Sequence, residues 1–328
     1  MYHKINQYLG KLGRLYAYKS ATILTLLIGL ILIFTILSPR YSFISYDSLN
    51  IILSVSPMIG IITLGMAVLI IAGEFDLSCG SVYAFGSMVV AVLFTNGVNP
   101  IIAICVALVL GTLLGWLNGI IVIKTNVSSL LVTLGSMWVY RGIVLVTLGG
   151  FTGRYYPDPI FTNLFAGKIF GLPIQFLWLI VIAVLLWLML EHTHFGNWIF
   201  ATGSNKWAAR SMGVNTNKVK IICFSLLGFL AAFAGVLEVS RISLAFPLAG
   251  QMTPLTAISG AVIGGTYLGG GSGTVLGGLF GALVISVLDA GLITLGFSYY
   301  YLDIAVGILL IIVAALQMKL KDIKITFK

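Results

Sequence analysis

The stretch EHTHFGNWIFATGSNKWAARSMGVNTNKVK, from Glu191 to Lys220, is a long polar interruption in a chain otherwise dominated by apolar runs. Asn205 can cap a helix from Lys206 to Met212, because its side chain accepts the free amide hydrogens of a first turn, and Gly213 can end that helix in a left-handed conformation. The stretch therefore predicts a short helix outside a bilayer, able to dock into a groove on a partner.

Composition places the surrounding sequence in a membrane. The 328 residues are 59% hydrophobic and 8% charged, and the mean hydropathy is +1.11. These values exclude a soluble globular protein and indicate a multi-pass protein of the cytoplasmic membrane, with lipid as a partner.

The net charge of +9 indicates orientation and predicts no nucleic-acid partner. With a cytoplasmic N-terminus, most basic residues fall on the inner side: Lys4, Lys11, Arg14, Lys19, Lys124, Lys206, Arg210, Lys218, Lys220, Lys319, Lys321, Lys324 and Lys328. This asymmetry follows the positive-inside rule.

Apolar segments long enough to span a bilayer, which needs about 20 residues, predict an all-α polytopic fold. The ten segments are Ala21–Leu37, Ile51–Ala72, Leu77–Phe94, Pro100–Ile123, Ser129–Leu148, Pro173–Leu190, Val219–Ser240, Pro254–Leu268, Thr274–Leu295 and Tyr300–Leu316. An even count returns the lysine-rich C-terminus to the cytoplasm. Pro254–Leu268 is short and glycine-rich, so it either crosses or forms a broken or re-entrant helix.

The predicted spans make up one domain. Residues 1–20 form a basic cytoplasmic N-terminal segment, residues 21–317 the transmembrane domain and residues 318–328 a cytoplasmic tail. Residues 191–218 form a cytoplasmic loop within the domain. The outer loop at 149–172 mixes polar and aromatic residues, which suits either contact with a soluble partner or an ordinary connection with interfacial tyrosines.

Glycines inside the spans predict close helix packing. Two sets repeat every four residues and so lie on one helix face each: Gly111, Gly115 and Gly119, then Gly273, Gly277 and Gly281. Two further glycine-interrupted stretches, Ile71–Gly80 and Gly264–Gly273, separate apolar runs. Broken segments of this kind commonly mark a transport pathway.

Six ionisable residues in or beside the spans are candidates for that pathway: Glu74, Asp76, Arg141, Glu238, Arg241 and Asp289. Asp76 also suits the cap of a helix starting at Leu77, with Glu74 at the membrane edge. Glu238 and Arg241 are three residues apart, and can therefore form a structural ion pair. Arg141 either lines the path or extends outward to the interface.

Enzymatic chemistry has little support in the sequence. Glu74 and Asp76 lack a neighbouring nucleophile, and the His192–His194 pair has no further ligands to complete a zinc site. P-loop, G-x-S-x-G and H-E-x-x-H motifs are absent. The sequence predicts no catalytic residue, metal or cofactor in this chain, so uphill transport would draw on an ion gradient or another subunit.

Several ordered motifs resemble one family. The run GEFDLSCGS at Gly73–Ser81 is similar to the G-G-x-D-L-S-x-G-S signature of permease subunits of bacterial ABC importers for ribose, xylose and related sugars, in the branched-chain amino acid and sugar permease superfamily. Glu74 and Cys79 depart from that signature. Further similar motifs are LVTLG at 131–135, YRG at 140–142, TGSN at 202–205, AAR at 208–210, SMGV at 211–214 and GGTYLGGGSG at 264–273.

The resemblance implies partners and a coupling site. Such a permease dimerises with a second copy or homologue, binds a cytoplasmic subunit that carries ATP and Mg²⁺, and receives sugar from a periplasmic or lipid-anchored binding protein. The coupling segment implied by the motifs comprises Gly203, Ser204, Asn205, Ala208, Ala209, Arg210, Gly213 and Val214.

Two alternatives remain open at the level of sequence. Relatives of this family that handle autoinducer-2 or nucleosides leave the solute undecided. A secondary transporter driven by protons or sodium would instead place its ion site at Asp289, Asp303, Glu238 and Arg241.

Overall fold

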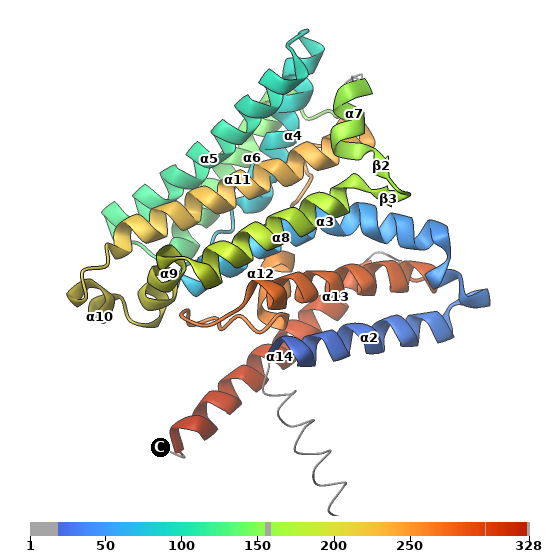
Figure 1. Cartoon of the computed structure of the whole chain (residues 1–328). Coiled ribbons are helices and arrows are strands. Elements are labelled where there is room, and N and C mark those ends of the chain that lie inside the picture. The colour runs from blue at the N-terminus through green and yellow to red at the C-terminus, as the bar shows by residue number, and fades with distance from the viewer. Residues whose placement is uncertain (1–18, 155–158, 299, 327–328) are drawn as a thin grey trace, which may run out of the picture.

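The computed structural model describes residues 19–154, 159–298 and 300–326, and almost all of them are helical. Six helices are long and apolar enough to cross a membrane: α3 (Tyr46–Ile71), α5 (Pro100–Thr125), α6 (Ser129–Leu148), α8 (Ile174–His192), α11 (Thr216–Ile242) and α13 (Val275–Thr294). Shorter apolar stretches lie in α2 (Lys19–Leu37), α4 (Cys79–Thr95), α12 (Thr253–Ile263) and α14 (Tyr300–Thr326). Together these helices match the predicted apolar segments and confirm the all-α polytopic fold (Figure 1).

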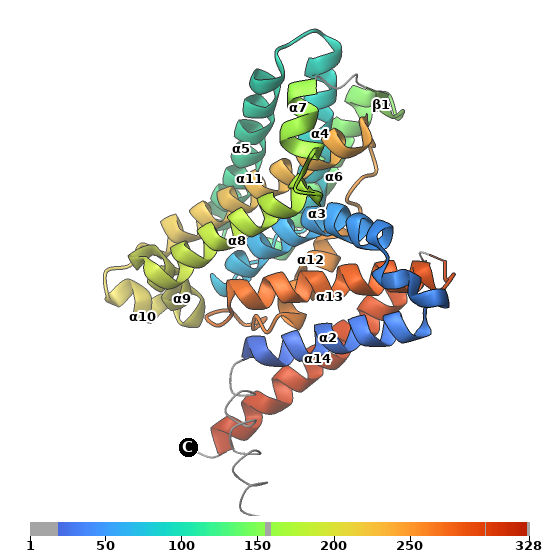
Figure 2. The ribbon, with the colours of Figure 1, turned by 45° about the vertical axis from the view of Figure 1, so that its right-hand side comes forward.

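Short helices and strands lie at the two ends of the bundle. At one end lie α9 (His194–Ser204) and α10 (Lys206–Ser211); at the other lie α7 (Pro159–Ala166) and a hairpin of β2 (Lys168–Ile169) and β3 (Leu172–Pro173), as Figures 1 and 2 show. Two further elements are a 3-10 helix, η1 (Pro39–Ile44), and the antiparallel pair of β1 (Gly153–Arg154) and β4 (Leu244–Ala245). The polar interruption thus holds two helices where the sequence predicted one, and the end that carries them is called the inner end below.

Two spans form the centre of the bundle. The most apolar 18 residues of each helix differ in how many of them are buried. In α3 72% of these residues are buried and in α11 67%, whereas only 28% are buried in α5 and 22% in α6. The exposed apolar side chains of α5 and α6 are therefore available to lipid, because a bilayer solvates them as well as a protein core does.

Glycine seams bring the helices together as the repeats predicted, except that Gly273 lies before the start of α13 and outside its seam. A Cβ atom placed on Gly115 of α5 would lie 2.2 Å from the carbonyl oxygen of Phe224 on α11, and one on Gly111 would lie 2.3 Å from the Cβ of Ala232. In the second seam, a Cβ on Gly281 of α13 would lie 2.0 Å from the carbonyl oxygen of Gly260 on α12. Only glycine permits these backbones to approach so closely.

One of the predicted spans, Pro254–Leu268, is broken. The helix α12 has 11 residues, or about 16 Å at 1.5 Å per residue, roughly half of the ~30 Å hydrocarbon thickness. It therefore does not cross as a helix, and residues 244–252 supply non-helical chain before it. The start of α4 meets this chain, since a Cβ on Gly80 would lie 2.1 Å from the carbonyl oxygen of Gly250.

Candidate functional site

The α10 helix forms as the local sequence predicts. The side chain of Asn205 accepts hydrogen bonds from the backbone amides of Trp207 and Ala208, both at 3.1 Å. Gly213 follows the helix with φ of +84°, a backbone conformation that favours glycine. Both ends of α10 are thus specified within the segment itself.

The side chains that α10 presents to solvent are not all those expected. Trp207 is 65% exposed and Met212 85% exposed, whereas Ala209 is buried at 5%. Arg210 turns back onto the chain, donating hydrogen bonds to Thr216 Oγ1 and Asn217 Oδ1 and lying 5.3 Å from the centre of the Trp207 ring. The outermost contact surface is therefore Trp207 and Met212. Sequence analysis missed this surface, and Trp207, one of two tryptophans in the polar stretch, is the signal that could have indicated it.

The other coupling residues predicted from sequence occupy two positions. Ala208 and Gly213 are exposed beside Trp207 and Met212, and Val214 packs against the main core. Gly203 and Ser204 belong to the end of α9, where they contact the two glycine-interrupted stretches. The predicted segment thus has an outward surface and an inward one.

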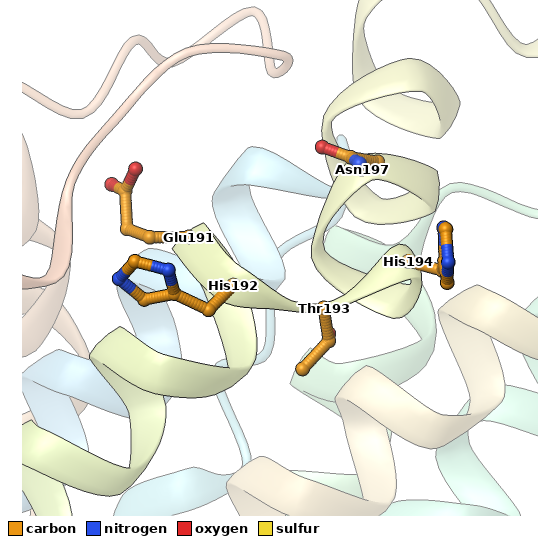
Figure 3. A pocket seen from close by; sticks show the side chains of 5 residues that line it. All are labelled: Glu191, His192, Thr193, His194 and Asn197. Atoms are coloured by element: carbon orange, nitrogen blue, oxygen red, sulfur yellow. The ribbon is translucent and has the colours of Figure 1, made fainter.

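A polar recess of about 410 Å³ lies where α8 passes into α9, lined by Glu191, His192, Thr193, His194 and Asn197. Figure 3 shows the side chains of Glu191 and His192 on one side of the recess and that of His194 pointing away on the other. His192 packs edge-on against Trp187 with ring centres 4.8 Å apart. Within the described residues no three His, Cys, Asp or Glu side chains gather where they could hold a metal ion.

Asp76 occupies a buried polar cluster between α3 and α4. Its Oδ1 accepts hydrogen bonds from the Ser78 amide at 2.7 Å and the Ser78 hydroxyl at 2.6 Å. Asn118 of α5 donates to the Ser78 hydroxyl at 2.8 Å and accepts from the Tyr140 hydroxyl of α6 at 2.9 Å. The expected cap at Leu77 is wrong, because α4 begins at Cys79 and Asp76 instead closes a local turn onto Ser78.

Arg141 joins α6 to the chain before α12 and to the start of α4. Its guanidinium donates to the carbonyl oxygens of Pro247 and Ala249, each at 2.6 Å, and of Gly80 at 3.2 Å. The residue is 7% exposed, so it does not extend outward to the interface. The Pro247 and Ala249 carbonyls lie outside regular helix, so they need such donors inside a membrane, whereas Gly80 belongs to the first turn of α4.

The remaining charged candidates lie in separate places. Glu74 forms an ion pair with Lys220 at the start of α11. Glu238 and Arg241 pair at 3.0 Å near the other end of α11. Asp289 lies in α13, where its Oδ1 is buried with no hydrogen-bond partner among the described residues. The six predicted pathway residues therefore do not form a single site.

The bundle, its broken helices and the helix projecting from one end define a polytopic α-helical membrane protein. Residues 48–314 match the family described as branched-chain amino acid transport system / permease component, and the chain belongs to that family. No solved structure matches the chain significantly.

Curated relatives match along most of their length. The chain is 38% identical over 297 residues to the ribose import permease protein RbsC of Escherichia coli (strain K12), covering 89% of this chain and 92% of the relative. It is 32% identical to the xylose/arabinose import permease protein XylH of Sulfolobus acidocaldarius, covering 84% and 79%. It is 30% identical to the autoinducer 2 import system permease protein LsrC of Escherichia coli O9:H4, covering 91% and 87%.

Proposed function

We propose that this chain is the membrane-spanning permease subunit of an ABC importer that carries a monosaccharide of the ribose or xylose type across the cytoplasmic membrane. The observation that carries the proposal is the end-to-end match to ribose and xylose/arabinose import permeases. The similarity to an autoinducer 2 permease keeps a modified sugar as the second candidate solute.

In this proposal the chain transports the sugar, and a separate subunit supplies the energy. ATP and Mg²⁺ would bind in a cytoplasmic ATPase, and a sugar-binding protein would deliver the solute at the opposite end, with a second permease copy completing the pathway. The non-helical chain held by Arg141 is compatible with a path through the bundle, since non-helical backbone inside a membrane occurs where it is buried in protein or lines such a path.

The ATPase would dock on α10. Trp207 and Met212, the residue that follows the helix, are the large exposed apolar side chains there, and Lys206 lies 5.2 Å from the Trp207 ring centre. An exposed tryptophan next to basic groups suits a groove with an apolar floor and an acidic rim. Contacts centred on a few aromatic anchors commonly dominate the affinity of an interface.

The first experiment is a co-purification in mild detergent from the native membrane. The native chain should bring down an ATP-binding subunit. A W207D/M212D variant should retain less than about a tenth of it, because anchors of this kind contribute about 2 kcal/mol or more each. Ala209 is left unchanged in this test, because it is buried and a charge there would test folding instead of docking.

The matched control is Phe170→Ala, which removes a fully exposed aromatic side chain at the opposite end of the bundle. Its yield of ATPase should equal that of the native chain. Liposomes containing the purified complex should import labelled ribose or xylose only with ATP and the sugar-binding protein. Uptake by the chain alone, abolished by an uncoupler and indifferent to ATP, would instead establish the ion-coupled alternative.

A further inference from the structure

The end of α9 is enclosed by the two glycine-interrupted stretches. A Cβ placed on Gly203 would lie 1.8 Å from the carbonyl oxygen of Ile71 and 2.6 Å from the amide nitrogen of Gly271. One on Gly271 would lie 2.6 Å from the Cα of Ser204. The backbone of α9 therefore touches the backbone of both stretches, with no side chain between them.

Hydrogen bonds join the same three segments. The Gly271 amide donates to the Ile71 carbonyl at 2.8 Å, which ties the second stretch to the first. The Ser204 hydroxyl donates to the Gly271 carbonyl at 3.4 Å. Beside them, the ion pair of Glu74 and Lys220 ties the first stretch to the start of α11. The contacts thus connect four segments that are distant in sequence.

This set of contacts lies between the proposed docking helix and the interior of the bundle. Only Asn205 separates Ser204 from α10 on one side. On the other side the stretches lead into α4 and α13, and the first turn of α4 carries the Gly80 carbonyl held by Arg141. Contacts between backbones have no rotamer freedom that could absorb a displacement, so they transmit movement more directly than contacts between side chains.

We propose that Gly203, Gly271 and the Glu74–Lys220 pair form the coupling junction through which displacement of α10 reaches the two glycine-interrupted stretches and, through them, α4 and α13. The inference rests on the proposed function, and it makes these residues positioning residues for transport. Gly203 is required because any larger residue separates α9 from Ile71 and Gly271. The ion pair keeps the first stretch aligned with α11 as the junction moves.

The test uses the complete complex of permease, ATPase and sugar-binding protein in liposomes, and measures ATP hydrolysed per sugar imported. In Gly203→Ala this ratio should rise about tenfold while the ATPase still co-purifies at its native ratio, an effect within the range seen for mutations along coupling networks. The matched control is Gly29→Ala in α2, where an added Cβ meets nothing within 4 Å. Its ratio should equal the native one.

Exchanging the charges of the Glu74–Lys220 pair tests the junction even if the Gly203→Ala variant does not assemble with the ATPase. Glu74→Lys alone and Lys220→Glu alone should each raise the ratio, and the double exchange should restore it to within about twofold of the native value. If Gly203 had only a structural role, Gly203→Ala would lower ATP hydrolysis and sugar import together and leave their ratio unchanged. Native ratios in Gly203→Ala, or in both single charge variants, would overturn the junction while leaving the proposed function intact. A native complex without ATP-driven uptake would overturn both.

Discussion

At the scale of single residues, Arg141 shows how a buried cation can be accommodated without a carboxylate. Three backbone carbonyls from two separate segments accept its hydrogen bonds. A planar guanidinium can satisfy them at once because its donors point in several directions within one plane. The residue therefore holds the non-helical chain before α12 against the first turn of α4.

We expect Arg141→Lys to lower the free energy of unfolding by about 1.5–3 kcal/mol, the contribution of one hydrogen bond to a charged group. An ammonium cannot reach all three carbonyls in the same geometry, so at least one is left unpaired. Thermal unfolding in detergent, followed by circular dichroism, measures the loss.

Arg241→Lys is the matched control for this change. Arg241 belongs to a partly exposed pair on one helix, and such pairs contribute about 0.2–1 kcal/mol. Equal losses in the two variants would contradict the role assigned to Arg141.

At the scale of elements, the glycine seam between α5 and α11 sets the spacing of the bundle. Gly111 and Gly115 face Gly228 across the seam, and a Cβ on Gly228 would lie 2.3 Å from the carbonyl oxygen of Gly111. Helices in a membrane gain no hydrophobic driving force from meeting each other. Close backbone packing therefore contributes much of what holds α5, whose outer face is exposed, against the central α11.

Gly115→Ala should destabilise the protein by about 1–3 kcal/mol, the usual effect of overpacking a tight interior site. Its added Cβ would overlap the Phe224 carbonyl at 2.2 Å. Gly135→Ala on α6 is the control, because nothing lies within 4 Å of its added Cβ. Comparing the midpoints of thermal unfolding tests the seam, and an unchanged midpoint for Gly115→Ala would exclude it.

At the scale of the whole molecule, the two ends of the bundle differ in kind. Figures 1 and 2 place α9, α10 and the C-terminal end of α14 at one end and α7 with the β2–β3 hairpin at the other. The basic residues of α10 and the start of α11 belong to the first end. The positive-inside rule therefore predicts that this end faces the cytoplasm.

Labelling with a membrane-impermeant thiol reagent tests this assignment. In a Cys105→Ser background, which removes the exposed cysteine and leaves the buried Cys79 and Cys223, the F170C variant should react in intact cells. The M212C variant should react only in inside-out vesicles or after permeabilisation. Labelling of both variants from one side would contradict the predicted topology.

Much of the architecture could be predicted from sequence because its causes are local. Apolar length specifies which segments become spans, since each must satisfy its own backbone within the bilayer. The cap at Asn205, the turn at Gly213 and the glycine seams follow from spacing alone. The cap assigned to Asp76 failed because a two-residue turn onto Ser78 competed with it, and the α9 helix was missed within the polar stretch.

The sequence by itself determined the all-α class, the glycine-interrupted stretch before α13 and the position of α10. Only the tertiary structure decided that Arg141 clamps Pro247 and Ala249, that Glu74 pairs with Lys220, and that Trp207 faces outward while Ala209 is buried. These facts depend on which segments meet across the bundle. Helical periodicity and span length carry no information about such contacts, because packing between distant segments selects them after each helix has formed.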